Sequence, residues 1–187
     1  GDISSQYISS LLMIAPVLPN GLKIDVMPPF YSKPYVMMTL NLMKKFGIKY
    51  DLSEDSISIN NQEYKSGSYK VESDWSAASY WYSFISINKK LKEIKLKGLR
   101  EHSFQGDQVI KKIIKIFNVE TLYDKDGIIL RKKDFDCDYL ELDFKDCPDL
   151  AQTVLVVAAF HKVKLKLYGV ESLKIKETDR LLSLIHI

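Results

Sequence analysis

The stretch that decides the fold is Asp74-Trp75-Ser76-Ala77-Ala78-Ser79, a short polar segment that runs directly into an apolar helical pattern. Related segments occur at Asp2-Ile3-Ser4-Ser5-Gln6 and at Pro148-Asp149-Leu150-Ala151-Gln152, so the pattern recurs about every 74 residues. A fixed period of this length predicts a chain that is built from similar structural units.

Each unit is predicted to follow the order β-α-β-α-β-β, which makes the chain an α/β (α+β) protein. After each first helix we expect a strand, at residues 22–27, 91–98 and 163–169. Second helices are expected to begin near Pro34, Asp107 and Lys176, where apolar residues recur at helical spacing. Strand pairs are expected to close the first two units, at 48–59 with 64–71 and at 121–126 with 128–136. The third unit has an entry strand at 139–144 but no closing pair, so we expect a fold that is incomplete at both ends.

Composition and charge are those of an ordinary folded protein. The chain has 187 residues, 46% of them hydrophobic, and a net charge of only +3 that is dispersed, which disfavours nucleic-acid binding. Its longest apolar stretch, Thr153 to Phe160, is far below the roughly 20 residues of a membrane span. Cys137 and Cys147 are too few for a disulfide framework and lack zinc-site spacing, which favours the reducing cytoplasm and no metal.

Two helix starts in the first unit could hold an anion. Ser4, Ser5 and Gln6 open the first helix, where unpaired N–H groups and the helix dipole favour negative charge. The alternative is that Ser4 simply caps the helix. Hydroxyls and a cation also precede the second helix, in Tyr31-Ser32-Lys33-Pro34-Tyr35, although this motif alone is only a helix start.

The third unit carries the densest charged cluster. Asp149 opens its first helix, either as a base or as a capping carboxylate. In Lys176-Glu177-Thr178-Asp179-Arg180, spacings of three and four place Lys176, Glu177 and Arg180 on one helical face. The alternative is a solvated helix start with a weak Glu–Arg pair.

The remaining polar and aromatic residues are predicted to be structural. The histidines have no partner at nucleophile or metal spacing, and Cys147 is isolated. The aromatic residues of the second unit's first helix are expected in the core; they are Trp75, Tyr80, Trp81, Tyr82 and Phe84.

Taken in order, the motifs resemble those of the EPSP synthase (3-phosphoshikimate 1-carboxyvinyltransferase) family. The resemblance runs along essentially the whole chain, and SSQ together with KETDR favours this family over the related UDP-N-acetylglucosamine enolpyruvyltransferases. The motifs are GDISSQ, YSKPY with TLNLMKKFG, VESDWSAASYW, FQGD, DFKDCPDLAQT and SLKIKETDR.

The resemblance implies the enolpyruvyl transferase fold, with two domains of repeated units. Residues 1–67 would be the last unit of the shikimate-phosphate domain, and residues 68–187 the first part of the second domain. It implies a transferase of the shikimate pathway, which serves chorismate and aromatic amino acid biosynthesis. Phosphoenolpyruvate and shikimate 3-phosphate would be joined through a tetrahedral adduct, with no cofactor.

The resemblance also assigns roles to single residues. Ser4, Ser5 and Ser32 would hold the shikimate phosphate, with Gln6 reaching the ligands and Tyr35 lining the site. Asp149 would contact the shikimate hydroxyls and act as base, Lys176 would bind the same substrate, and Glu177 would handle the methylene proton. Arg180 would pair with the carboxylate or phosphate of phosphoenolpyruvate.

Other family motifs, among them an early Lys-Ser segment and late Arg and Lys residues, do not occur in this sequence. We therefore expect residues 1–187 alone to be inactive. A non-catalytic module that binds an anion through Ser4, Ser5 and Ser32 remains the alternative function.

Overall fold

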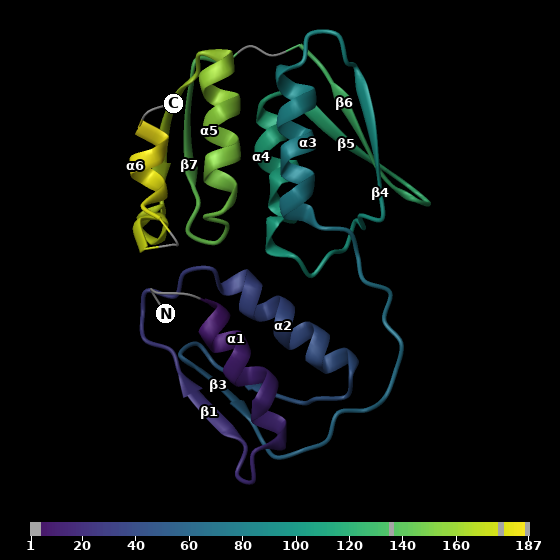
Figure 1. The fold of residues 1–187 in the computed structure, drawn as a ribbon, viewed down its shortest axis with the longest axis vertical. Helices are drawn as coiled ribbons and strands as arrows, with labels where there is room; N and C mark the ends of the chain where they lie inside the picture. The colour runs from purple at the N-terminus through teal and green to yellow at the C-terminus, as the bar shows by residue number, and fades with distance from the viewer. Residues whose placement is uncertain (1–4, 135–136, 176–177, 186–187) are drawn as a thin grey trace. The chain divides into compact units, whose positions relative to one another are not determined.

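The computed structural model describes residues 5–134, 137–175 and 178–185 (Figure 1). The chain divides into two compact units, Gly1–Lys70 and Val71–Ile187. Within the described part, the longest helices have 13 residues, and no helix has the length and apolar character needed to cross a membrane.

In the first unit, two helices pack over a small antiparallel sheet with strand order β1-β3-β2. Alternate residues of β3, Ile57 and Ile59, are buried and meet Leu12, Val36 and Leu40 from the helices. Buried residues recur at every second position in the strand and at every third or fourth position in the helices, so they face one another and form one core. The elements are α1 (Ser5–Ile14), β1 (Leu22–Asp25), α2 (Lys33–Lys45), β2 (Asp51–Leu52) and β3 (Ser56–Ile59), with a 3-10 turn at Ala15–Val17.

The prediction of a strand at 64–71 is wrong. This segment joins no sheet, and two of its residues instead bond to groups at the ends of α1 and α2. The Lys65 N–H donates to the Phe46 carbonyl at 2.8 Å, and the Tyr64 hydroxyl donates to the Met13 carbonyl at 2.8 Å. The expected strand at 48–59 is also broken into β2 and β3 by a turn at Ser53.

The second unit contains two sheets. The first is antiparallel with order β4-β6-β5, and the second is the parallel pair β7-β8. The strands are β4 (Glu93–Lys97), β5 (Val119–Asp124), β6 (Gly127–Lys132), β7 (Tyr139–Asp143) and β8 (Lys164–Tyr168). The helices are α3 (Trp75–Ile87), α4 (Ile110–Ile116), α5 (Leu150–His161) and α6 (Arg180–Ile185), with 3-10 segments at Gly106–Val109 and Glu171–Ile175.

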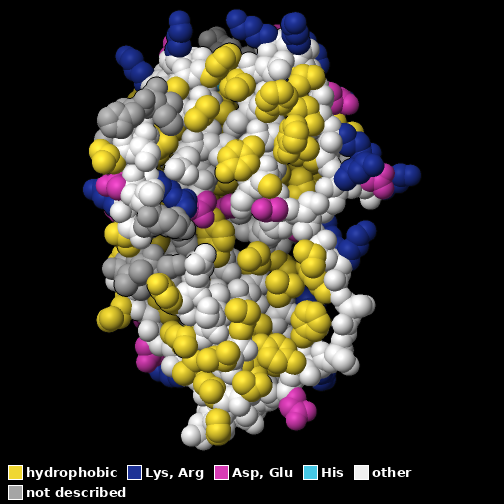
Figure 2. Space-filling view, in the orientation of Figure 1, with side chains coloured by type: hydrophobic (Ala, Val, Ile, Leu, Met, Phe, Trp, Pro, Cys, Tyr) yellow, Lys and Arg dark blue, Asp and Glu magenta, His cyan; other side chains and the backbone are white. Residues whose placement is uncertain are grey.

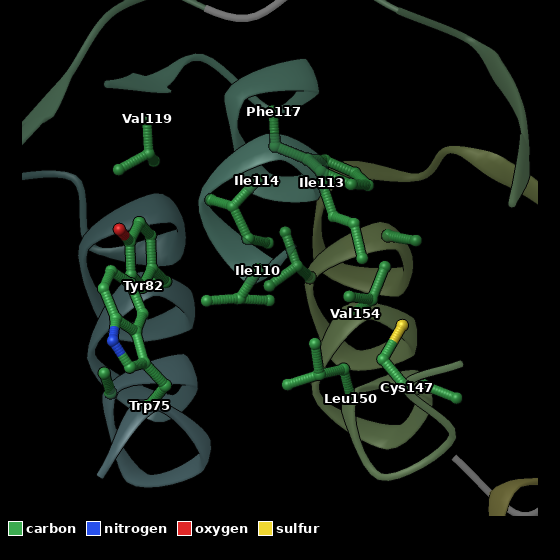
Figure 3. Close-up of a cluster of buried hydrophobic side chains, with 14 of the residues drawn as sticks. Trp75, Tyr82, Ile110, Ile113, Ile114, Phe117, Val119, Cys147, Leu150 and Val154 are labelled. Atoms are coloured by element: carbon green, nitrogen blue, oxygen red, sulfur yellow. The ribbon is translucent and has the colours of Figure 1, made fainter. Parts of the chain in front are cut away.

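The core of this unit lies where α3, α4 and α5 meet (Figure 3). Trp75 and Tyr82 reach in from α3, Ile110 and Ile114 from α4, and Val154 from α5, and all five are fully buried. The first helices of the second and third repeats, α3 and α5, therefore pack against each other in this core.

Three of the five aromatic residues expected in the core of α3 are exposed, so that prediction is only partly right. Tyr80, Trp81 and Phe84 are 69%, 49% and 44% exposed, whereas Trp75 and Tyr82 are buried. The helix is apolar on two faces, and only one of them meets α4 and α5. Figure 2 shows hydrophobic side chains on the surface over α3.

Candidate active site

In the first unit, the predicted anion-binding residues lie at two helix starts. Ser5 and Gln6 are the first two residues of α1, and Ser32 occupies the N-cap position of α2, with Tyr35 in the first turn. Figure 1 shows both helices beginning at the same end of the unit. The positive ends of two helix dipoles are thus directed to one side, which favours an anion there. Ser4 lies outside the described residues.

Ser32 has the most constrained backbone of this group. It is only 7% exposed and adopts a left-handed conformation, with φ 60° and ψ 26°, yet its side chain makes no capping hydrogen bond. A non-glycine residue in this conformation costs on the order of 1 kcal/mol and is typical of functional sites. Its carbonyl accepts a hydrogen bond from the Tyr35 N–H at 3.1 Å, which fixes the first turn of α2.

In the second unit, Asp149 and Arg180 form an ion pair. Arg180 Nη1 donates to Asp149 Oδ1 at 2.9 Å, although the two residues are 31 positions apart. Asp149 is the N-cap residue of α5, but it has helical backbone angles and makes no capping hydrogen bond. The capping interpretation of Asp149 is therefore wrong. The side chains are 39% exposed for Asp149 and 23% for Arg180, so the pair borders solvent.

The parallel strands β7 and β8 bring this pair together. The chain leaves β7 at Asp143 and reaches Asp149 after five residues, and it leaves β8 at Tyr168 and reaches Arg180 through a 3-10 segment. In open α/β sheets, ligands bind beyond the carboxyl ends of the parallel strands. The ends stay close because the Phe144 N–H donates to the Tyr168 carbonyl at 2.8 Å.

Carboxylates surround the start of α5. Burial, together with the smaller effect of neighbouring negative charges, raises the pKa of the Cys147 thiol to about 12; the charges are those of Asp107, Asp146, Asp143 and Asp149. Cys147 is 4% exposed, so it is a packed thiol and not a nucleophile. Among the described residues, no group of three or more His, Cys, Asp or Glu side chains is placed so that it could hold a metal ion.

A polar network that the sequence analysis did not assign fixes the start of α3. Glu72 accepts hydrogen bonds from Trp75 Nε1 at 2.9 Å, from Ser103 Oγ at 2.5 Å and from the Arg100 N–H at 2.6 Å. In the same region, the buried Asp107 carboxylate accepts from Ser76 Oγ at 2.5 Å. Glu72, Trp75 and Asp107 lie in the motifs VESDW and FQGD, which the sequence analysis used only for the family resemblance.

Lys176 and Glu177 lie outside the described residues, so the structure gives no position for these two predicted site residues. Just before them, Ser172 is 4% exposed, and its hydroxyl has no hydrogen-bond partner among the residues that the structure describes. No sequence signal distinguishes this serine.

Residues 1–186 match the family model of EPSP synthase (3-phosphoshikimate 1-carboxyvinyltransferase). The chain belongs to the EPSP synthase family. The 3-phosphoshikimate 1-carboxyvinyltransferase of Bacteroides fragilis is 45% identical over 182 residues, which cover 97% of this chain and 44% of the relative. The enzyme of that name from Methanocaldococcus jannaschii is 37% identical over 183 residues, which cover 97% of this chain and 42% of that enzyme. The chain thus spans less than half the length of these EPSP synthases.

Among solved structures, an EPSP synthase from Acinetobacter baumannii aligns with 95% of this chain and 44% of its own, at 13% identity and a TM-score of 0.41. The family assignment rests on the sequence match. The membership of the EPSP synthase family that SSQ and KETDR predicted is therefore confirmed.

Proposed function

We propose that the protein containing this chain transfers the enolpyruvyl group of phosphoenolpyruvate to the 5-hydroxyl of shikimate 3-phosphate and releases inorganic phosphate. The observation that carries this proposal is the family match over residues 1–186. The relatives named above are called 3-phosphoshikimate 1-carboxyvinyltransferases, the enzymes of this reaction. A cytoplasmic location is part of the proposal, since Cys137 and Cys147 are free thiols.

The first unit would bind the phosphate of shikimate 3-phosphate. Ser5 and Ser32 supply hydroxyls at two helix starts, with Ser4 beside them in the sequence. Gln6 and Tyr35 would contact the rest of the ligand. Support comes from the helix dipoles, which favour an anion, and from the left-handed Ser32, whose strained backbone places its hydroxyl at a helix start.

The second unit would supply the proton transfers. Asp149 takes the proton of the 5-hydroxyl while that oxygen bonds to C2 of phosphoenolpyruvate, and Glu177 delivers a proton to the methylene carbon. The Glu177 carboxylate then takes a proton back from the new methyl group, and the C2–O bond to phosphate breaks with release of inorganic phosphate. Lys176 would contact shikimate 3-phosphate, and Arg180 the carboxylate or phosphate of phosphoenolpyruvate.

The ion pair between Asp149 and Arg180 fits this division of roles. The guanidinium fork can accept a second anion while Nη1 stays on Asp149 Oδ1. Asp149 is 39% exposed and borders solvent, so a substrate hydroxyl can approach its carboxylate. The pair would therefore hold the base next to the phosphoenolpyruvate anion before the second substrate binds.

The test is a phosphate-release assay on the protein that contains residues 1–187 with any flanking sequence of its gene. Asp149→Asn is expected to lower kcat by at least about 100-fold, the lower range for a lost general base. Asp146→Asn removes an exposed carboxylate three positions away and should change kcat less than about twofold. The proposal fails if both substrates bind without phosphate release, which would favour the anion-binding module, or if Asp149→Asn keeps full activity.

A further inference from the structure

The outer edge of β5 borders a basic groove that the proposed reaction does not use. Among the described strands, β5 pairs only with β6, so its other edge has no strand partner. A hollow of about 230 Å³ lies along this edge, and a second of about 490 Å³ adjoins it, touches β5 at Tyr123 and shares Lys111, Lys112 and Tyr123 with the first. The smaller hollow is lined by Lys115 and by four successive residues of β5, 120–123.

The lysines of this groove are not neutralised by carboxylates in the described part of the chain. Lys111 Nζ donates to Gln108 Oε1 at 2.9 Å and to the Glu101 carbonyl at 3.2 Å, which are both uncharged acceptors. Lys112 and Lys115, on the same helix, form neither a hydrogen bond nor an ion pair with the described residues.

Two acidic residues line the groove against three lysines: Glu101 borders the larger hollow, and Glu120, in the smaller one, is already paired. The Glu120 carboxylate lies 2.5 Å from Lys133 Nζ, and this bond holds its pKa below the usual range, with Lys115 contributing a smaller effect. The groove therefore has a positive charge excess, which attracts an anionic partner.

We propose that this groove binds an acidic peptide segment in extended conformation, added as a strand along the free edge of β5. An unpaired edge offers N–H and C=O groups at regular intervals, and strand addition is a common mode of peptide recognition. Lysines beside an edge disfavour the addition of a neutral or basic strand and favour a strand that carries carboxylates.

The spacing of the lysines fits such a strand. Lys111 and Lys115 are one helical turn apart, a rise of about 6 Å along α4. Side chains that face the same way on a strand are about 6.6 Å apart, since they alternate. The helix leads into β5 after Asn118 and the strand runs back beside it, so acidic side chains at alternate positions would meet both lysines.

The test uses a fluorescent hexapeptide of alternating Glu and Val, measured by anisotropy against residues 1–187. Binding should weaken at least about tenfold in the double variant Lys112→Glu with Lys115→Glu, and it should fall as salt rises. The matched control, Lys89→Glu with Lys90→Glu, reverses the charge of two exposed lysines outside the groove and should leave the affinity within about twofold. All variants are exposed substitutions, and their melting temperatures are compared first.

A second peptide, N-methylated at alternate amides, separates strand addition from simple charge attraction, because it keeps the carboxylates and loses the backbone donors. It should bind at least about tenfold more weakly, and only the unmodified peptide should slow amide exchange at residues 120–123. Equal binding of the two peptides, equal loss in the Lys89 and Lys90 control, or no binding to the unaltered chain would each overturn the proposal.

Discussion

The ion pair between Asp149 and Arg180 should contribute a measurable coupling free energy to folding. Its atoms lie 2.9 Å apart, and the side chains are 39% and 23% exposed. Two charges about 4 Å apart attract by about 1 kcal/mol in water and about 4 kcal/mol near a protein surface. Ordering two long side chains and screening by solvent offset most of this, so we expect a coupling of about 1 kcal/mol.

A double-mutant cycle measures that coupling directly. Urea unfolding is followed for the unaltered chain, for Asp149→Asn, for Arg180→Gln and for both together, and the non-additive part is the interaction energy. A matched cycle pairs Asp146→Asn with Arg180→Gln and should give less than about 0.3 kcal/mol, because no ion pair links those residues. If the Asp149 cycle gives the same small value, the ion pair does not hold the base in place and that part of the mechanism is refuted.

Three further predictions concern residues outside the ion pair. Burial lowers the pKa of His161, and the charge of Lys132 lowers it further. The stability that neutral His161 contributes is therefore present in full above the unfolded pKa of about 6.5 and is lost as pH falls through the folded pKa. Urea midpoints should decrease from pH 7.5 to 5.5, and His161→Gln should remove this part of the decrease. Cys137 should react with a thiol reagent in the folded protein, whereas Cys147, whose pKa is raised to about 12, should react only on unfolding; equal rates would contradict this. Ser172→Ala should raise the free energy of unfolding by about 1 kcal/mol, because it removes a buried hydroxyl that has no described partner, and a loss of stability would mean that the hydroxyl is satisfied.

The start of α3 and the β5–β6 hairpin could be predicted because local chemistry determines them. α3 begins at Trp75, directly after Asp74, whose carboxylate accepts a hydrogen bond from the Ser76 N–H at 2.7 Å. The hairpin between β5 and β6 forms where the sequence predicts a turn, and Asp124 Oδ1 accepts the Gly127 N–H at 2.9 Å. Capping and turn residues act within a few positions, so they can be identified from the sequence.

The buried face of α3 could not be predicted in the same way. Its aromatic residues lie on both sides of the helix, and hydrophobic character alone does not distinguish the face that meets α4 from the face that meets solvent. Ala78, Tyr82 and Ile85 are buried, whereas Tyr80 and Trp81 are exposed. Only the tertiary arrangement separates the two groups.

The pairing of Asp149 with Arg180 depends on this kind of long-range information. Helical spacing within KETDR left a local pair of Glu177 with Arg180 as one alternative, and Glu177 lies outside the described residues. In the structure, Arg180 bonds to a carboxylate 31 positions away, because two parallel strands end side by side. The proposed base and the proposed anion-binding cation come from separate motifs and therefore meet only once the β7–β8 pair has formed. It follows that substitutions that weaken this strand pair should impair both functions together, even though they touch neither side chain.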